Sequence, residues 1–503
     1  EGESEGVAEG DNEGEDEGSE EGQDEGGSEG SGEGVTEEGE GETEGQSENH
    51  LEQIASLNSN EWIILNPEGD PEYGMARARA WGGEMAYAPE LGGGLLYGEG
   101  VHGWWNQNPE SPGFGHYMDD LWFYDIETNS WETLYPGYNV NPVAKSGGGY
   151  EPDSMSCFPE PDEGQSLRDR MAEMTDDEIT NTNNCLKEKT NLCINSDGVT
   201  ATSSAFGEYP HCAEGVESTP LAVSTMVHGY EMLAWDGDRE QFLSMTCSGG
   251  YYDSAIPEYR YIHTHYSDLL NNRVSPWIFD MNTRQWDRHP APTTDDRYVS
   301  SPMGAVMHYL PDQHKTFFWN HMSAPSDVNN WFYDNVNQEW NILEAGGTPP
   351  PFGIDGSSAY DPVRKRIYMG GGAYPSVEIG ENPMWIYDTE ANTWTDPQPT
   401  GDSVGTSFST NNNILHYDTV NDVLILFRHG ACDEEVNRCG IFIYDPVENN
   451  WTKTDGAPLW LEENYLYHRS VSAFYSPEYN AHFFWVALDS DDNGRMFVYR
   501  YNK

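Results

Sequence analysis

Residues 385–394 read Trp-Ile-Tyr-Asp-Thr-Glu-Ala-Asn-Thr-Trp, and this stretch contains the pattern that decides the fold. Its first three side chains are aromatic or β-branched, which is typical of a strand. Asp388 and the polar residues after it favour a tight turn, and Trp394 opens the next strand. The stretch therefore predicts a β-hairpin whose paired strands bring Tyr387 and Trp394 into the packing between neighbouring sheets.

The same pattern recurs four more times, always with an aromatic residue seven positions before a Trp and an Asp between them. The other copies are Leu121–Trp131 (LWFYDIETNSW), Trp277–Trp286 (WIFDMNTRQW), Trp331–Trp340 (WFYDNVNQEW) and Ile441–Trp451 (IFIYDPVENNW). Internal repeats of this length are the signature of a solenoid, a propeller or an array. Each aromatic pair is expected to contribute about 1 kcal/mol beyond its buried area.

A second hairpin precedes the aromatic one. Residues 357–372 (SSAYDPVRKRIYMGGG) and 414–430 (ILHYDTVNDVLILFRHG) each contain a strand ending in Tyr-Asp, a turn, and an apolar run ending in Gly. Two hairpins give each unit four strands, which is the make-up of one propeller blade. The sequence therefore predicts an all-β propeller spanning residues 61–503.

Counting the units predicts six blades. The sixth unit has strands near 465–475, 482–487 and 496–501, and the sequence given ends at Lys503 before a fourth strand. Residues 61–66, which begin EWIIL, are expected to supply that strand from the other end. Such closure ties the first blade to the last and removes the open edge of the ring.

Two segments fall outside the repeat. Residues 1–60 carry 22 acidic and no basic side chains, and they predict a disordered acidic tether. Residues 138–218, between blades 1 and 2, are interpreted as an insertion with four cysteines and a helical run over 166–179 capped by Ser166. A hidden seventh blade there is the alternative, and it is disfavoured because no strand alternation and no Tyr…Trp pair are visible.

The units resemble Kelch repeats, in their Gly run after the second strand and in the spaced Tyr…Trp pair. The double Gly is present at Gly249–Gly250 and Gly370–Gly371, and it is missing near Asn320 and Leu488. The resemblance covers roughly residues 61–503. It implies a six-bladed propeller with its ligand on the face where the loops entering each blade, and those joining second and third strands, converge.

The charge of the chain restricts its partners. It has 88 acidic and 24 basic side chains, and 66 of the acidic ones lie beyond residue 60. Such a field repels nucleic acids and anionic membrane surfaces, so a glycan or an extracellular protein is the expected partner. The same field fits binding of Ca²⁺ or another divalent metal, without fixing a cofactor.

Cysteines and hydropathy indicate an extracellular or cell-surface location. The seven cysteines are Cys157, Cys185, Cys193, Cys212, Cys247, Cys432 and Cys439. They form no CxxC pair, and Cys432 and Cys439 flank one short loop, so disulfides in an oxidising compartment are the simplest account. Reduced, buried cysteines are the alternative. No apolar run reaches the roughly 18–20 residues of a membrane helix, and a chain starting at Glu1 suggests a bacterial secreted or lipoprotein-like protein whose leader was removed.

The longest predicted loop, residues 249–276, is the main candidate site. It contains Tyr251, Tyr252, Arg260, Tyr261, His263 and His265. Tyr and Arg planes stack on sugar rings, and His titrates near neutrality. His263 and His265 would share a face of a strand, as two metal ligands do, but no third ligand is visible. A packed or exposed loop without ligand is the alternative.

Further candidates open a first strand or follow a second strand of a blade. They are Arg77, His228, Arg297, His321, His429, His468 and Arg469. Arg side chains gathered near the axis would suit a carboxylate or a sulfate, because Arg donates two parallel hydrogen bonds. Alternatively, each pairs with one of the many acidic side chains nearby.

Three functions stay open at this point. The first is a surface-displayed protein that binds a glycan or protein ligand on its loop face, with residues 138–218 forming part of that face. The second is a polysaccharide lyase, in which His263 or His228 and Tyr261 exchange protons and Arg260 neutralises a uronate. The third is a structural or adhesive surface protein. A similarity to galactose-oxidase-like copper enzymes rests on Tyr467-His468, but Cys247 does not open a first strand as that family's cross-linked Cys does.

Overall fold

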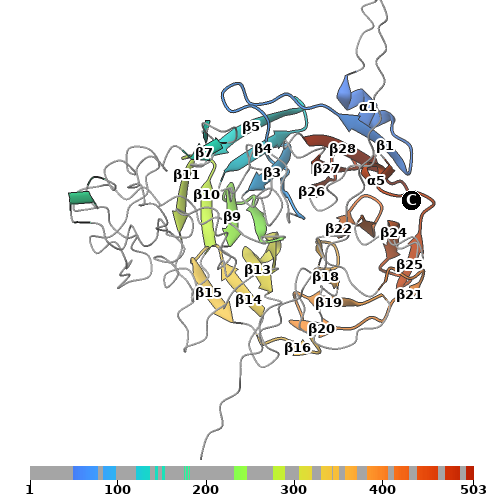
Figure 1. The fold of residues 1–503 in the computed structure, drawn as a ribbon. Coiled ribbons are helices and arrows are strands. Elements are labelled where there is room, and N and C mark those ends of the chain that lie inside the picture. The colour runs from blue at the N-terminus through green and yellow to red at the C-terminus, as the bar shows by residue number, and fades with distance from the viewer. Residues whose placement is uncertain are drawn as a thin grey trace, which may run out of the picture. The chain divides into compact units, whose positions relative to one another are not determined.

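The chain forms a six-bladed β-propeller in the computed structural model (Figure 1). Residues 1–47 and 48–503 are separate units, and only the second contains described residues. The predicted acidic tether therefore lies outside the described residues up to residue 48. The structure describes residues 49–76, 83–97, 120–135, 142–144, 150–152, 175, 177–178, 181, 231–245, 276–288, 305–319, 330–342, 344–350, 357–370, 382–405, 413–429, 439–462, 471–487 and 494–503.

Each of the first three blades is a four-stranded antiparallel sheet. Blade 1 contains β2 (Ala86–Ala88), β3 (Gly93–Tyr97), β4 (Leu121–Asp125) and β5 (Ser130–Tyr135). Blade 2 contains β8 (Leu233–Asp236), β9 (Gln241–Met245), β10 (Pro276–Asp280) and β11 (Gln285–Arg288). Blade 3 contains β12 (Val306–Leu310), β13 (Lys315–Trp319), β14 (Asn330–Asp334) and β15 (Glu339–Ile342).

The last three blades keep this plan and add strands from elsewhere in the chain. Blade 4 contains β17 (Ser358–Asp361), β18 (Arg366–Gly370), β19 (Met384–Asp388) and β20 (Thr393–Thr395), with β16 (Gly346–Gly347) parallel to β20. Blade 5 contains β22 (Asn413–Asp418), β23 (Val423–Arg428), β24 (Gly440–Asp445) and β25 (Asn450–Lys453), with β21 (Thr400–Gly401) parallel to β25. Blade 6 contains β26 (Val471–Ser476), β27 (Ala481–Ala487), β28 (Gly494–Arg500) and β1 (Glu61–Leu65).

The six first strands surround the axis. Each contacts the next in the order β2, β8, β12, β17, β22, β26, and β26 contacts β2 again, so the ring is closed. Backbone hydrogen bonds join two pairs of neighbouring blades. Met85 N of blade 1 donates to Ala473 O of blade 6 at 2.8 Å, and Met307 N of blade 3 donates to Glu231 O of blade 2 at 2.8 Å. The predicted count of six blades is confirmed.

The closing strand is also confirmed. β1 pairs antiparallel with β28, with Trp62 opposite Tyr499. The Trp62 ring lies 4.7 Å from the ring of Tyr499 and 5.5 Å from that of Phe484, so the strand is held by packing as well as by its backbone. Blade 6 therefore consists of both ends of the propeller, which leaves no unpaired edge where the ring closes.

The fold begins earlier than the predicted end of the tether at residue 60. Residues His50–Ser56 form helix α1, and Asn49 caps it by accepting a hydrogen bond from Leu51 N at 3.1 Å. Ile54 and Leu57 are buried in the same apolar cluster as Leu65. Ile54 and Leu57 are three residues apart, which is a helical spacing. The acidic composition of the preceding segment masked this signal in the sequence.

The repeated motif forms the second hairpin of a blade, and the hydrogen bonds and backbone conformation of this hairpin explain its sequence. The turn Asp accepts backbone hydrogen bonds from the residues two and three positions later, as Asp445 does from Val447 and Glu448. The residue just before the second strand has a left-handed backbone, for example Asn449 with φ 51°. The aromatic rings then lie 5.4 Å apart in Tyr124–Trp131, 5.4 Å in Tyr333–Trp340, 5.0 Å in Tyr387–Trp394 and 5.1 Å in Tyr444–Trp451.

The motif Trp also contacts the preceding blade, as predicted. Trp131 of blade 1 lies 5.0 Å from Trp485 of blade 6, edge to face. Trp394 of blade 4 lies 4.8 Å from Trp319 of blade 3 in the same arrangement. Such pairs are the preferred geometry of aromatic rings, so the repeat joins the blades as well as the strands.

Asn449→Ala should destabilise the protein by about 2–3 kcal/mol, because alanine tolerates a left-handed backbone less well than asparagine and the change removes two hydrogen bonds. The lost bonds are those from Tyr444 Oη (2.8 Å) and to Pro397 O (2.7 Å). Asn449→Gly removes the same bonds without backbone strain, so its cost should be about 1 kcal/mol smaller. Urea unfolding measures both variants, and equal losses would contradict the role assigned to the backbone.

The described part of the predicted insertion contains a short two-stranded sheet, in a segment whose sequence shows no strand alternation. β6 (Pro142–Ala144) and β7 (Tyr150–Pro152) pair antiparallel. Strands of three residues are too short to show alternation in a sequence. Farther along, Asp177 and Glu178 are helical, inside the predicted run. Thr175 and Glu178 exchange hydrogen bonds in a capping box, whereas Ser166, the expected cap, lies outside the described residues.

Candidate functional site

Most of the predicted site residues lie outside the described residues. They are Arg77, His228, Tyr251, Tyr252, Arg260, Tyr261, His263, His265, Arg297, His321, His468 and Arg469. Their roles in catalysis or ligand binding therefore stay predictions.

His429 is the one predicted site residue within the described part of the chain. It follows β23 at the face where the first strands begin, and 2% of its surface is exposed. Its ring meets that of Trp460 edge to face at 5.8 Å, and Trp460 belongs to helix α5 (Leu459–Glu462) between blades 5 and 6. The imidazole thus packs beneath α5, and its contact with a ligand stays a prediction.

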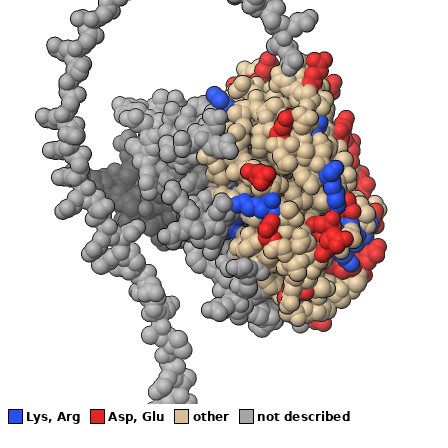
Figure 2. Space-filling view, turned by 90° about the vertical axis from the view of Figure 1, so that its right-hand side faces the viewer, with Lys and Arg blue, Asp and Glu red and all other residues tan. Residues whose placement is uncertain are grey.

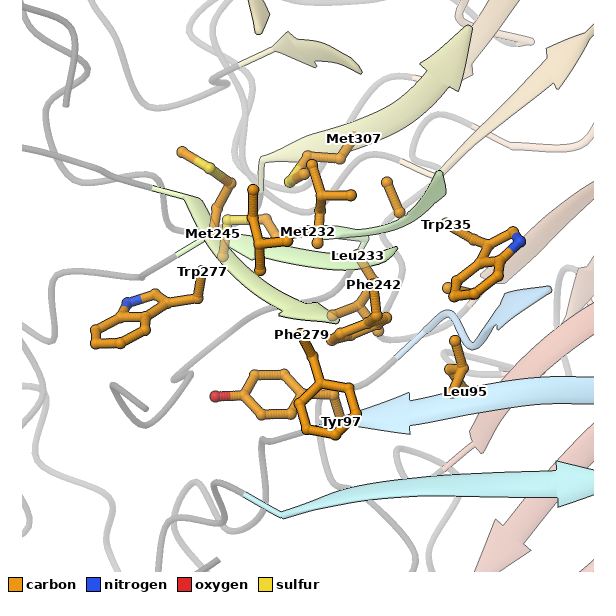
Figure 3. Close-up of a cluster of buried hydrophobic side chains, with 14 of the residues drawn as sticks. Leu95, Tyr97, Met232, Leu233, Trp235, Phe242, Met245, Trp277, Phe279 and Met307 are labelled. Atoms are coloured by element: carbon orange, nitrogen blue, oxygen red, sulfur yellow. The ribbon is translucent and has the colours of Figure 1, made fainter. Parts of the chain in front are cut away.

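Two glutamates stand at the start of neighbouring first strands. Glu84 lies two residues before β2 in blade 1, and Glu231 lies two residues before β8 in blade 2. Met232, the neighbour of Glu231, is buried with Leu233 and Met307 in the apolar cluster between blades 1, 2 and 3 (Figure 3). This packing fixes the backbone of Glu231, whose own side chain is directed to another blade.

The side chain of Glu231 reaches blade 4. Its carboxyl accepts hydrogen bonds from Ser358 N, at 2.9 Å for the nearer oxygen, and from the Ser358 hydroxyl. Nε2 of His308, in blade 3, lies 2.7 Å from the same hydroxyl. Because that hydroxyl donates to Glu231, the imidazole N–H donates to the hydroxyl. Glu231, Ser358 and His308, together with Glu84, form what we call the axial cluster, with one residue from each of four blades.

Burial controls the charge of the axial cluster. It raises the pKa of Glu231 to about 8, although the hydrogen bonds from Ser358 oppose the shift. Burial, with the nearby charge of Glu231, also raises the pKa of Glu84 well above its ordinary value. Burial lowers the pKa of His308 to about 4. At neutral pH the cluster is therefore an essentially uncharged set of carboxyl, hydroxyl and imidazole groups.

One oxygen of the cluster has no partner. Glu84 Oε2 is shielded from solvent and makes no hydrogen bond within the described structure. A buried polar atom of this kind costs about 1–3 kcal/mol of stability unless a ligand or water satisfies it. In the described part of the chain neither glutamate contacts a Lys or Arg side chain.

The cluster is not a ready-made metal centre. Within the described ranges, no group of three or more His, Cys, Asp or Glu side chains is arranged to hold a metal ion. The chemistry it offers is hydrogen bonding: a protonated carboxyl both donates and accepts, and the serine hydroxyl does the same.

Sequence reasoning missed the two glutamates, although a weak signal existed. Both are followed by Met at the opening of a first strand, as Glu84-Met85 and Glu231-Met232. A single acidic residue before an apolar strand attracts no attention in a chain with 88 of them. Basic and aromatic residues were selected instead because they stood out against this background.

Comparison with known proteins leaves the family open. No protein-family model matches the chain, and no curated protein matches it. Among the described residues, no helix has the length and apolar character needed to cross a membrane. The function must therefore be argued from the site itself.

Proposed function

We propose that this chain is an extracellular, Kelch-type propeller that binds a glycan on the face where its first strands begin. The observation that carries the proposal is the anchoring of the segment between β9 and β10. Met245, the last residue of β9, donates its backbone N–H to Met232 O at 3.3 Å, directly beside Glu231. Pro276, the first residue of β10, pairs with Met245. Both ends of the Tyr-, Arg- and His-rich segment thus lie next to the axial cluster.

The chemistry of the segment between β9 and β10 and that of the axial cluster support a sugar ligand. The segment supplies aromatic and guanidinium planes, which stack on sugar rings. The axial cluster supplies neutral donors and acceptors, which match hydroxyl groups. Figure 2 shows both acidic and basic side chains on one described side of the molecule, and the excess of 88 acidic over 24 basic side chains in the whole chain disfavours a highly anionic ligand.

The axial cluster also distinguishes the proposed glycan binding from the alternative functions. A polysaccharide lyase must neutralise a uronate, and two carboxyls without a basic partner in the described structure oppose such a substrate. A protein ligand or an adhesive role requires no such cluster. The glycan that we propose is therefore neutral.

An extracellular location is part of the proposal. Cys439, immediately before β24, is disulfide-bonded, and its partner lies outside the described residues. We infer that Cys432 is that partner, because it flanks the same loop in the sequence. Structural disulfides of this kind persist in oxidising compartments.

The test is a glycan array probed with the full chain, followed by calorimetry on the best hit. Wild type should bind a neutral glycan without degrading it, and Tyr261→Phe should weaken binding about tenfold or more, since it loses roughly 1–2 kcal/mol of hydrogen bonding. His314→Asn changes an exposed side chain on the opposite, turn-bearing face and should bind as wild type does. An ultraviolet-absorbing unsaturated product from a uronate polymer would instead establish the lyase, and absence of any glycan hit would refute the proposal.

A further inference from the structure

Two imidazoles join blades 5 and 6. His416 lies in β22 and His482 in β27, and their Nδ1 atoms are 2.9 Å apart. The ring planes differ by 8° and the centroids are 5.2 Å apart. Stacked rings stay about 3.5 Å apart, so nitrogens at 2.9 Å require rings that meet edge to edge. One Nδ1–H therefore donates to the other Nδ1, directly across the seam between the blades.

The carboxylate of Asp418 determines which imidazole donates. Its Oδ2 lies 3.8 Å from Nε2 of His482. A hydrogen on that Nε2 is attracted by the carboxylate, whereas a lone pair there is repelled. We therefore assign the Nε2–H tautomer to His482, which then accepts at Nδ1 while His416 donates.

The surroundings of the pair are dry and carry one charge. Burial opposes ionisation of Asp418, but the nearby imidazole of His482 and hydrogen bonds from Asn421 hold its pKa below the ordinary value. The hydroxyls of Tyr475 (β26) and Tyr499 (β28) are the other titratable groups that face the pair, and burial raises the pKa of both. The remaining neighbours are apolar rings from β23 and β27, Phe427 and Phe484.

Protonation affects the pair in two steps. The first proton goes to Nε2 of His416, and the bond from its Nδ1–H to His482 remains. The second proton has only Nδ1 of His482 to bind, and both facing nitrogens then carry a hydrogen. The hydrogen bond is lost and two imidazolium rings face each other, with Asp418 compensating one charge at most. Burial lowers the pKa of both histidines, so these protons bind only well below neutrality.

We propose that this pair is an acid-operated latch on the seam between blades 5 and 6. Blade 6 is the blade that holds β1, so the seam borders the closure of the ring. In acid the latch opens, β22 separates from β26 and β27, and blade 6 loses its support on one side. The consequence is an acid-dependent loosening of the propeller at one defined place, independent of any ligand.

The experiment compares wild-type full chain with His416→Asn between pH 7.5 and pH 4.5. The amide N–H of Asn occupies the place of Nδ1–H and keeps the bond, but it cannot take a proton. Each proton linked to unfolding raises the unfolding equilibrium constant tenfold per pH unit. The wild-type dependence should therefore be steeper than that of the variant by about tenfold per unit below about pH 6. Urea unfolding measures this difference.

Hydrogen exchange locates the effect. On acidification, the intrinsically corrected exchange should rise first in residues 413–429 and 471–487 of wild type, and this rise should be smaller in His416→Asn. His314→Asn replaces an imidazole that is 53% exposed in blade 3 and should leave exchange at this seam unchanged. His482→Asn tests the same bond from the other strand. If His416→Asn keeps the wild-type pH dependence, or if all seams open together, the latch does not exist.

Discussion

A chain that begins at residue 67, and so lacks α1 and β1, is expected to lose the cooperative folding of the propeller. β1 supplies the outer strand of blade 6, and Trp62 contacts Tyr499, Phe484 and, at 5.4 Å, Trp460. Removing one buried aromatic or aliphatic side chain costs about 2–5 kcal/mol, and this strand carries the buried Leu65 and the half-buried Trp62, Ile63 and Ile64. The sum is comparable with the whole stability of roughly 5–15 kcal/mol. Urea unfolding and circular dichroism would measure the loss.

The matched control for this truncation is a chain that begins at Glu48. It lacks the separate acidic unit but keeps α1 and β1, and its stability should equal that of the full chain. A synthetic peptide of residues 48–66, added to the chain that begins at residue 67, should restore cooperative unfolding at saturating concentration. A truncated chain that unfolds as wild type does would show that ring closure does not depend on β1.

The fold could be predicted because its signals are local. Tyr444, Asp445, Asn449 and Trp451 all belong to one hairpin, and the turn hydrogen bonds and the ring contact that define the motif are made within it. The same spacing of an aromatic residue, an Asp and a Trp recurs in other units, which makes the pattern easy to recognise. The closing strand was predicted because the last unit lacked one strand and residues 61–65 had the composition to supply it. Both inferences needed only the pairing rules of antiparallel sheets.

The axial cluster could not be predicted because its members meet only when the ring is closed. Glu231 and Ser358 are separated in the sequence by all of blade 3, and nothing near either residue indicates the other. His416 and His482 present the same difficulty, since each is a single polar residue inside an apolar strand. Sequence patterns specify the faces of a strand, whereas contacts across seams and across the axis depend on how the blades are arranged.

Glu231→Gln is expected to reverse part of the pH dependence of stability. The carboxyl of Glu231 has a pKa of about 8 in the folded chain, against an ordinary value of 4.5. Between these values the folded state binds more protons than the unfolded state, so wild type loses stability as the pH rises, by up to about 1.4 kcal/mol per unit. Glutamine cannot ionise, and its amide oxygen can still accept from Ser358 N and from Ser358 Oγ. The variant should therefore gain on wild type by roughly 3–4 kcal/mol between pH 5 and pH 8.

Urea unfolding at half-unit pH steps from 5 to 9 would measure this gain. Glu339→Gln removes an exposed carboxyl from β15 and should parallel wild type throughout.

At acid pH the stability of wild type depends on pH in the opposite direction. Burial holds the pKa of His308, His416 and His482 below 6.5, so wild type loses stability as the pH falls below that value. The two ranges overlap between pH 4.5 and pH 6.5, so wild type should be most stable where the opposing slopes cancel, and Glu231→Gln should move that maximum to higher pH. Parallel curves for wild type and Glu231→Gln would mean that the carboxyl ionises normally, and the uncharged axial cluster on which the choice of a neutral glycan rests would then be wrong.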